Sequence, residues 1–229
     1  MTRTPADLIP LMCSNCGSAL EGEDESALFT CAACGLVHEP CEEGLASYPA
    51  MSARITTRLA ASQQIRYLAV WRMRAPKWEH INHIVPRGTG HLYVPAFSLT
   101  RPVMQKLGAA LCLAQPALEF DSGLPVTNSS RPVLVEAGRQ DPTAFLEGPG
   151  FEGVSPVVVG RRDLKALAEF VYLSVELGGQ RELHELLPLG FDLGLADEEL
   201  VFLPAVWDTR YIREAYWRFL LSEFDDQVA

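Results

Sequence analysis

Two short cysteine motifs constrain the start of the chain more than any other feature of the sequence. Cys13 and Cys16 form one Cys-x-x-Cys pair, Cys31 and Cys34 form a second, and fourteen residues separate the two pairs. A tetrahedral zinc site takes four soft donors at about 2.3 Å, and a tight Cys-x-x-Cys turn brings two thiolates to one ion. Two such pairs at this spacing predict that the four cysteines bind one metal ion.

Glycine follows the second cysteine of each pair, at Gly17 and Gly35. Glycine tolerates the left-handed backbone that directs amides back toward the sulfurs, so its position supports a metal-binding turn. A pair of disulfides or four reduced core cysteines is the alternative. We disfavour it because no signal peptide precedes the motif and disulfides are rare in the cytosol. Rubredoxin-type iron takes the same four ligands and is the alternative to zinc at this site.

Over residues 11–40 the motif resembles the zinc ribbons of the transcription-factor-IIB-like or rubredoxin-like group. The resemblance implies a small all-β module with structural Zn²⁺, because four protein ligands leave no open position for a water. It does not imply one function, since ribbons occur in polymerases, ribosomes, helicases and many uncharacterised bacterial proteins. His38 and Cys41 follow closely and could act as alternative ligands, although we expect Cys41 to be a spare thiol and Cys112 to lie in the core.

Length and composition indicate a folded protein with a sizeable core. The chain has 229 residues, of which 48% are hydrophobic, with 10 Phe and 4 Trp. These values argue against disorder. No apolar run reaches the roughly 20 residues that span a bilayer, and the start lacks a secretory segment, so we expect a cytoplasmic protein without a transmembrane segment. Arginine outnumbers lysine 16 to 3, which is typical of a GC-rich bacterial genome.

We expect an α+β fold, with a zinc ribbon in residues 1–45 followed by an α+β domain in residues 46–229. The small residues of 41–54 predict a linker between the two. The segment IRYLAVWRMRA, residues 65–75, predicts a strand because its residues alternate between two faces. Helical spacing is also found in residues 55–63.

An internal repeat is the second organising feature. LYVPAFSLTRPV (92–103) matches VFLPAVWDTRYI (201–212), and the similarity extends to 92–112 and 201–221. Each copy predicts a strand, a turn marked by proline and then a helix. Residues 156–177 predict a third strand-turn-helix unit without the proline. Chance similarity in a proline-rich chain is the alternative.

The net charge of −10 conceals a strong asymmetry along the chain. Residues 1–45 sum to −7, residues 54–106 to +8 and residues 180–229 to −7. No basic residue lies between the first and last predicted metal ligands. Such a ribbon should repel nucleic acid, whose phosphates attract lysine and arginine. We therefore expect the ribbon to dock on a basic protein surface, either residues 54–106 of the same chain or a partner subunit.

The candidate interaction residues fall into three groups. The acids of the insert between the cysteine pairs are Glu23, Asp24 and Glu25; the apolar anchors beside the cysteines are Leu28, Phe29, Leu36 and Val37; and the basic residues are Arg66, Arg72 and Arg74. An apolar anchor is needed because complementary charge sets orientation and encounter rate more than affinity. The alternative for the acidic insert is a solvated loop.

Three classes of function are compatible with the sequence. The chain has no P-loop, no Gly-x-Ser-x-Gly elbow and no His-Glu-x-x-His motif. We therefore favour a non-enzymatic adaptor or accessory subunit that binds protein partners, in the setting of a larger complex. The second class is a nucleic-acid-binding protein that uses the basic stretch 54–106, with aromatic side chains for base stacking: Tyr67, Trp71, Trp78 and Tyr93. The third is a metalloenzyme.

The metalloenzyme alternative rests on three histidines in EHINHIVPRGTGH, namely His80, His83 and His91. Imidazoles at such spacing could hold a second metal, or one of them could act as a base. A surface loop with ordinary histidines is the simpler interpretation.

Overall fold

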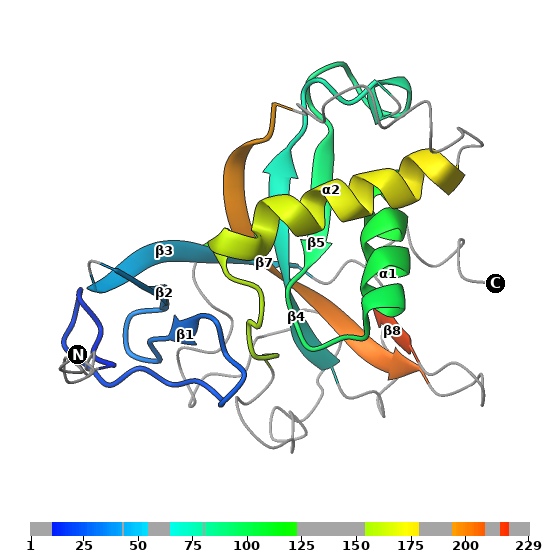
Figure 1. Cartoon of the computed structure of the whole chain (residues 1–229). Helices are drawn as coiled ribbons and strands as arrows, with labels where there is room; N and C mark the ends of the chain where they lie inside the picture. The colour runs from blue at the N-terminus through cyan, green and yellow to red at the C-terminus, as the bar shows by residue number, and fades with distance from the viewer. Residues whose placement is uncertain are drawn as a thin grey trace, which may run out of the picture.

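Two helices cover one face of a mixed sheet (Figure 1). The cysteine-rich start of the chain, residues 11–42, forms a small module at one end of that sheet, here called the cysteine module. The computed structural model describes residues 11–42, 44–54, 65–79, 81–122, 154–178, 194–208 and 216–219. The strands are β1 (Phe29–Thr30), β2 (Leu36–Cys41), β3 (Gly44–Ala53), β4 (Ile65–Arg74), β5 (His91–Pro95), β6 (Phe120–Ser122), β7 (Ala196–Asp208) and β8 (Tyr216–Phe219). The helices are α1 (Arg101–Ala114) and α2 (Arg161–Gly178), with a short 3₁₀ turn at Ile81–His83.

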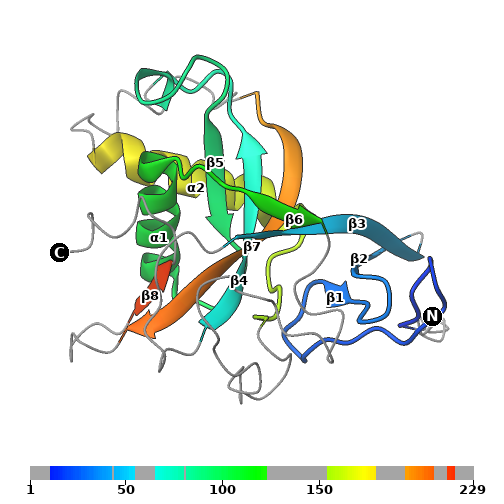
Figure 2. The ribbon, with the colours of Figure 1, turned by 180° about the vertical axis from the view of Figure 1, so that it is seen from behind.

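The strand order is β1-β2-β3-β7-β4-β5, with β6 paired to β3 and β8 paired to β7. Strands β3 and β7 run parallel, and the other pairs are antiparallel. Seen from behind, β4 and β5 pass in front of α2, and α1 stands beside the sheet (Figure 2). A mixed sheet with two helices confirms the α+β class.

The core is centred on β4 and β7. The predicted strand over 65–75 is confirmed, since β4 covers residues 65–74. Leu68 and Val70 are 1% and 0% exposed, so the face of β4 that also carries arginines is buried. Strands buried on both faces have nearly continuous apolar sequence, as residues 200–205 of β7 also do.

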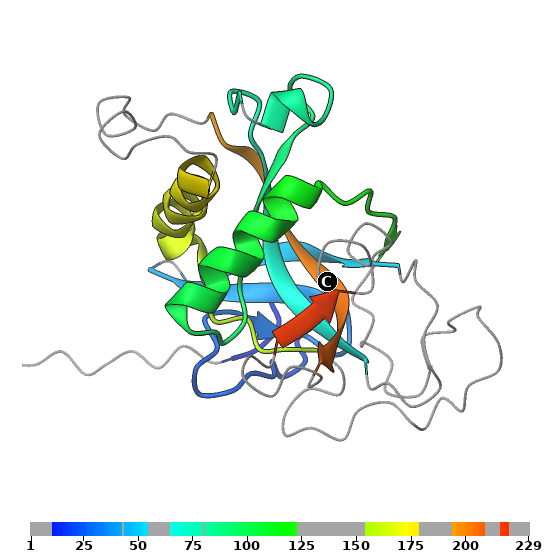
Figure 3. The same cartoon turned by 90° about the vertical axis from the view of Figure 1, so that its right-hand side faces the viewer.

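Helices α1 and α2 lie side by side over this sheet (Figure 3). The helix predicted within residues 156–177 is confirmed as α2, but the strand predicted before it is wrong, because residues 154–160 form only isolated bridges, at Val154 and Val157. No helix in the described ranges is long and apolar enough to cross a membrane.

Helix α1 closes the outer edge of β5. The side-chain amide of Gln115, which ends α1 in a left-handed conformation, accepts from the His91 N–H at 2.9 Å and donates to the His91 carbonyl at 2.6 Å. The Tyr93 N–H donates to the sulfur of Cys112, which is buried as predicted. These side chains satisfy backbone groups that an open edge would offer to another strand.

The predicted linker over residues 41–54 is wrong, because Gly44–Ala53 forms the strand β3. The first half of β3 pairs with β2 of the cysteine module, and its second half pairs with β7 and β6 of the main sheet. Its small and turn-forming residues, Gly44, Ser47 and Pro49, conceal the strand pattern in the sequence. The cysteine module is therefore joined to the sheet by a continuous strand.

The repeat predicted in 92–112 and 201–221 differs between its copies. The first is a strand, a turn and a helix, as expected, in β5 and α1. In the second, β7 continues through Pro204 to Asp208, and residues 216–219 form β8 where a helix was predicted. Pairing with β4 and β8 on its two sides holds this part of β7 extended. The predicted helix over residues 55–63 lies outside the described residues.

Candidate metal centre

The four predicted ligands lie together at one end of the molecule. The sulfurs of Cys13, Cys16, Cys31 and Cys34 all lie within 4.8 Å of one another. The sulfurs of Cys13 and Cys34 are 3.4 Å apart, as are those of Cys16 and Cys31, so each short contact joins the two pairs. Four sulfurs around zinc at about 2.3 Å would be separated by about 3.8 Å, so this cluster could hold one metal ion.

The local backbone explains how two distant pairs form one site. Gly17 and Gly35 have φ values of 74° and 75°, the left-handed region predicted from the sequence. The Gly17 N–H donates to the Cys13 carbonyl at 2.9 Å, and the Gly35 N–H donates to the Cys31 carbonyl at 2.8 Å. The two turns thus have the same geometry and present their sulfurs in the same way.

The thiols differ in burial and acidity. Cys13 and Cys31 are buried, whereas Cys16 is exposed. Burial raises the pKa of Cys31 to about 12, while a hydrogen bond with Ser18 lowers the pKa of Cys16 to about 6. A hydrogen bond with the Leu36 backbone lowers the pKa of Cys34. A bound metal ion deprotonates its thiol ligands outright, so it would replace the protons that the cluster otherwise shares.

The candidate apolar anchors divide between two cores. Leu28 and Val37 are 2% and 0% exposed and belong to the main core of the sheet and helices. Phe29 packs in the separate small core around the cysteines, and Leu36 is half-buried. The Ala27 N–H also donates to the Val157 carbonyl at 2.8 Å, which ties the module to the segment before α2. Two of the four anchors therefore contact the chain's own domain.

The acidic insert projects into solvent. Glu23, Asp24 and Glu25 are all exposed. The turn is held by two local hydrogen bonds: the Glu23 N–H donates to the hydroxyl of Ser26, and the Ser26 N–H donates to the Glu23 carbonyl. The structure thus presents the three carboxylates at the surface.

His38 lies close to the cysteines but outside their cluster. The ring is 0% exposed, and its Nδ1 lies 3.0 Å from the hydroxyl of Ser47, which in turn lies 2.8 Å from the hydroxyl of Ser14 in the first cysteine turn. Its Nε2 has no hydrogen-bond partner among the described residues. Burial lowers the pKa of His38, so the ring is neutral near pH 7. Cys41, the other alternative ligand, is half-buried and also outside the cluster.

Two of the candidate arginines pair with β7. Arg72 lies 2.8 Å from Glu199, and Arg74 lies 2.8 Å from Asp197. Arg66 is half-buried on β4. The charges of Arg72 and Arg74 are therefore offset by acids of β7.

Among the described residues, those proposed for base stacking and for a second metal are not gathered into a site. The four aromatic side chains are buried: Tyr67 is 6% exposed, and Trp71, Trp78 and Tyr93 are each 1% exposed. His83 is exposed, and His80 lies outside the described residues. In the described ranges the four cysteines form the only group of three or more His, Cys, Asp and Glu side chains close enough to share a metal.

Burial and charge keep His91 neutral. Desolvation, together with the neighbouring Arg72 and Arg74, lowers the pKa of His91 to about 4.

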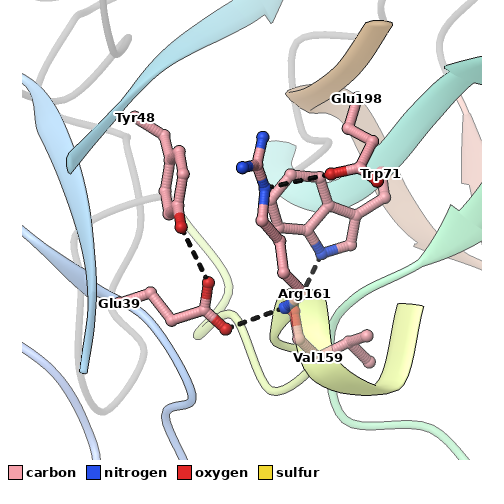
Figure 4. Close-up of polar contacts among 6 residues, drawn as sticks. All are labelled: Glu39, Tyr48, Trp71, Val159, Arg161 and Glu198. Carbon is pink, nitrogen blue, oxygen red and sulfur yellow. Dashed lines mark hydrogen bonds and ion pairs between the residues drawn. The ribbon is translucent and has the colours of Figure 1, made fainter. Parts of the chain in front are cut away.

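Sequence reasoning missed a polar cluster where the module meets the start of α2. Its members come from five parts of the chain: Glu39, Tyr48, Trp71, Val159, Arg161 and Glu198 (Figure 4). The signal for it lies in VVVGRRD, where a helix begins after Gly160. Glycine has no side chain to accept hydrogen bonds from the first amides, so an acceptor from elsewhere is needed.

In comparisons with known proteins, no protein-family model, curated protein or solved structure matches this chain.

Proposed function

We propose that the four cysteines hold one structural Zn²⁺ ion in a zinc ribbon and that the protein is a non-enzymatic adaptor or accessory subunit. The observation that carries the metal assignment is the cluster of four sulfurs within 4.8 Å of one another. Four thiolates complete a tetrahedral sphere and leave no position for a reacting water, so the ion stabilises the module and does not catalyse a reaction. Reduced thiols require a reducing compartment, which supports a cytoplasmic location.

The partner that the surface favours is a protein with a basic face. The exposed acids of the insert, Glu23, Asp24 and Glu25, sum to a charge of −3 and are available for contact. Nucleic acid is disfavoured as the partner for two reasons. Arg72 and Arg74 are already paired with acids of β7, and the aromatic side chains of this stretch are buried. Binding to DNA or RNA needs cations and rings that reach the ligand.

The metal assignment is tested by elemental analysis of the purified protein. We expect one zinc ion per chain, and we expect it to be lost in the double variant Cys31→Ser/Cys34→Ser, since two of four ligands are removed. An iron centre would instead give visible thiolate-to-metal absorption and iron in the analysis. Unchanged metal content in the double variant would exclude this site. The variant Cys41→Ser, which changes a cysteine outside the cluster, is the matched control.

The adaptor assignment is tested by charge reversal in the acidic insert. In the triple variant Glu23→Lys/Asp24→Lys/Glu25→Lys the metal content should stay at one per chain, because none of the three side chains is a ligand. The variant should capture less of the partner from the native host than the wild type does, as analysed by mass spectrometry. Its remaining capture should also depend less on salt concentration than that of the wild type. If capture is unchanged, the insert is a solvated loop. A submicromolar complex with DNA or RNA at physiological salt would favour the nucleic-acid class.

A further inference from the structure

Glu39 of the cysteine module caps a helix of the main domain. The Glu39 carboxylate accepts from the backbone N–H of Arg161, the first residue of α2, at 2.8 Å, and it accepts from the Tyr48 hydroxyl at 3.2 Å (Figure 4). Burial and the Glu39 charge raise the pKa of Tyr48, which keeps its hydroxyl protonated as the donor. The first amides of a helix carry partial positive charge and lack partners within the helix, so a carboxylate is a favourable cap.

The position before the helix is shaped for this carboxylate. A Cβ atom on Gly160 would lie 2.5 Å from the Glu39 carboxylate oxygen. A serine, threonine or aspartate at this position would cap the helix with its own side chain, but it would collide with Glu39. The cap of α2 is thereby assigned to a residue of the cysteine module, 122 residues earlier in the chain.

The side chain of Arg161 extends the contact across the sheet. Its guanidinium lies 4.2 Å from the ring centre of Tyr48 and 6.0 Å from that of Trp71, and its Nε lies 3.1 Å from Glu198 (Figure 4). The Trp71 indole N–H donates to the Val159 carbonyl at 2.8 Å, just before the helix. The start of α2 is thus held by β2 and β3 on one side and by β4 and β7 on the other.

The path from this cap to the cysteines is short. Glu39 lies on β2, which begins two residues after Cys34, and the Cys31 N–H donates to the Leu36 carbonyl at 2.9 Å. The core around the cysteines has only a few apolar side chains: Leu20, Phe29 and Leu45. Small modules of this kind are stabilised by metal binding, so we expect the ion to add to the pairing with β3 in fixing the position of β2.

We propose that metal binding at the four cysteines controls the N-terminal end of α2 through the carboxylate of Glu39. With metal bound, β2 holds Glu39 on the first amide of the helix and the cluster around Arg161 is closed. Without metal, β2 moves away from the start of α2. The first turn of α2 then loses its cap, and Arg161 is released from Tyr48. The inference rests on the proposed metal site and adds regulation to it: whether the cysteines hold metal determines whether the first turn of α2 is capped.

Thermodynamic linkage makes this coupling measurable from both ends. If metal binding strengthens the cap, the cap must strengthen metal binding by the same factor. Glu39→Ala should therefore weaken zinc binding by about tenfold, the factor that corresponds to about 1.4 kcal/mol. Glu39→Gln keeps an acceptor but loses the charge, so its effect should be smaller. Zinc affinity is measured on the full chain by competition with a chelator of known affinity.

Two matched controls separate this effect from a general loss of surface charge. Glu42→Gln changes another acid of the module, which lies 3.9 Å from Arg162 with both side chains largely exposed. Glu119→Gln removes an exposed ion pair with Arg54, outside the cluster around Arg161. Neither should change zinc affinity by more than about twofold, because exposed ion pairs contribute little.

Amide hydrogen exchange measures the coupling at the start of α2. Removal of zinc from the wild-type protein should increase exchange of the Arg161 amide by at least about tenfold, while amides of β4 and β5 stay protected and show that the domain is folded. In zinc-loaded Glu39→Ala the Arg161 amide should exchange as in the metal-free wild type.

Different outcomes overturn different claims. A protein that binds no metal refutes the proposed site and this inference with it. One zinc per chain, with wild-type zinc affinity in Glu39→Ala and an Arg161 amide unaffected by zinc removal, refutes only the coupling. If zinc removal unfolds the whole chain, the affinity comparison between Glu39→Ala and Glu42→Gln decides: equal affinities refute the coupling.

Discussion

Trp78 donates its indole N–H to a carboxylate oxygen of Glu176 at 2.8 Å, and the two side chains are 1% and 2% exposed. The bond joins the segment after β4 to the last turns of α2, 98 residues later. Loss of the donor would leave a buried carboxyl oxygen of Glu176 without this partner. We expect Trp78→Phe, which keeps an aromatic ring, to lower the free energy of unfolding by about 1–3 kcal/mol in urea denaturation.

A surface carboxylate provides the control for this prediction. Glu119 lies 3.4 Å from Arg54, and their side chains are 72% and 54% exposed. Glu119→Gln should change the free energy of unfolding by less than about 0.5 kcal/mol, as is usual for exposed ion pairs. Equal effects of the two variants would show that the buried bond contributes no more than a surface pair.

Gly108 sets the distance between the two helices and β5. A Cβ atom at this position of α1 would lie 2.8 Å from the Val171 Cγ2 atom of α2 and 3.1 Å from the Tyr93 carbonyl oxygen. In an open helix interior, glycine to alanine stabilises by about 0.5–1 kcal/mol. Here we expect the opposite sign: Gly108→Ala should destabilise by about 1–3 kcal/mol in thermal or chemical denaturation, because the site is already filled.

A double variant checks the cause. Val171→Ala removes the side-chain atoms that a new Cβ would meet, while the Tyr93 carbonyl stays in place. The double variant Gly108→Ala/Val171→Ala should therefore be more stable than the sum of the two single changes predicts. Strict additivity would mean that the helices do not clash at this point.

Local patterns predicted the parts of the fold that depend on neighbouring residues. The spacing of Cys13, Cys16, Cys31 and Cys34 predicted their cluster, alternation predicted β4, and the strand-turn-helix pattern of residues 156–177 predicted α2. Periodicity failed at residues 216–219, where an apolar pattern compatible with a helix forms β8. There the pairing with β7 decides the backbone conformation, and partner strands are not visible in a local window.

The contact between the cysteine module and α2 could not be predicted for the same reason. Nothing in the sequence near Glu39 identifies the amide of Arg161 as its partner. The charge pattern predicted that acids near the cysteines would meet a basic surface, either the stretch 54–106 or a partner subunit. Within that stretch, Arg72 and Arg74 pair with β7. The net charge of a segment shows that it needs oppositely charged neighbours. Which residues become those neighbours is decided by the pairing of strands in the sheet.

Acidification should destabilise the protein through His91. Burial, with help from Arg72 and Arg74, lowers the pKa of His91 to about 4, below the ordinary value of 6.5. The folded state therefore favours the neutral ring. Between pH 6.5 and about 4 the unfolded chain binds more protons at this site than the folded chain, so stability falls as pH falls through this window. The lowered pKa of His38, also due to burial, acts with the same sign.

Urea denaturation at a series of pH values from 7.5 to about 5 tests this in the wild type and in His91→Asn. Asparagine does not titrate, so the variant should lose less stability on acidification than the wild type, even if it is less stable at pH 7.5. The cysteine cluster also releases metal in acid, but it does so in both proteins, and the difference between the two slopes isolates His91. Equal slopes would show that His91 titrates alike in the folded and unfolded states, which would contradict the lowering of its pKa by partial burial and by the nearby Arg72 and Arg74.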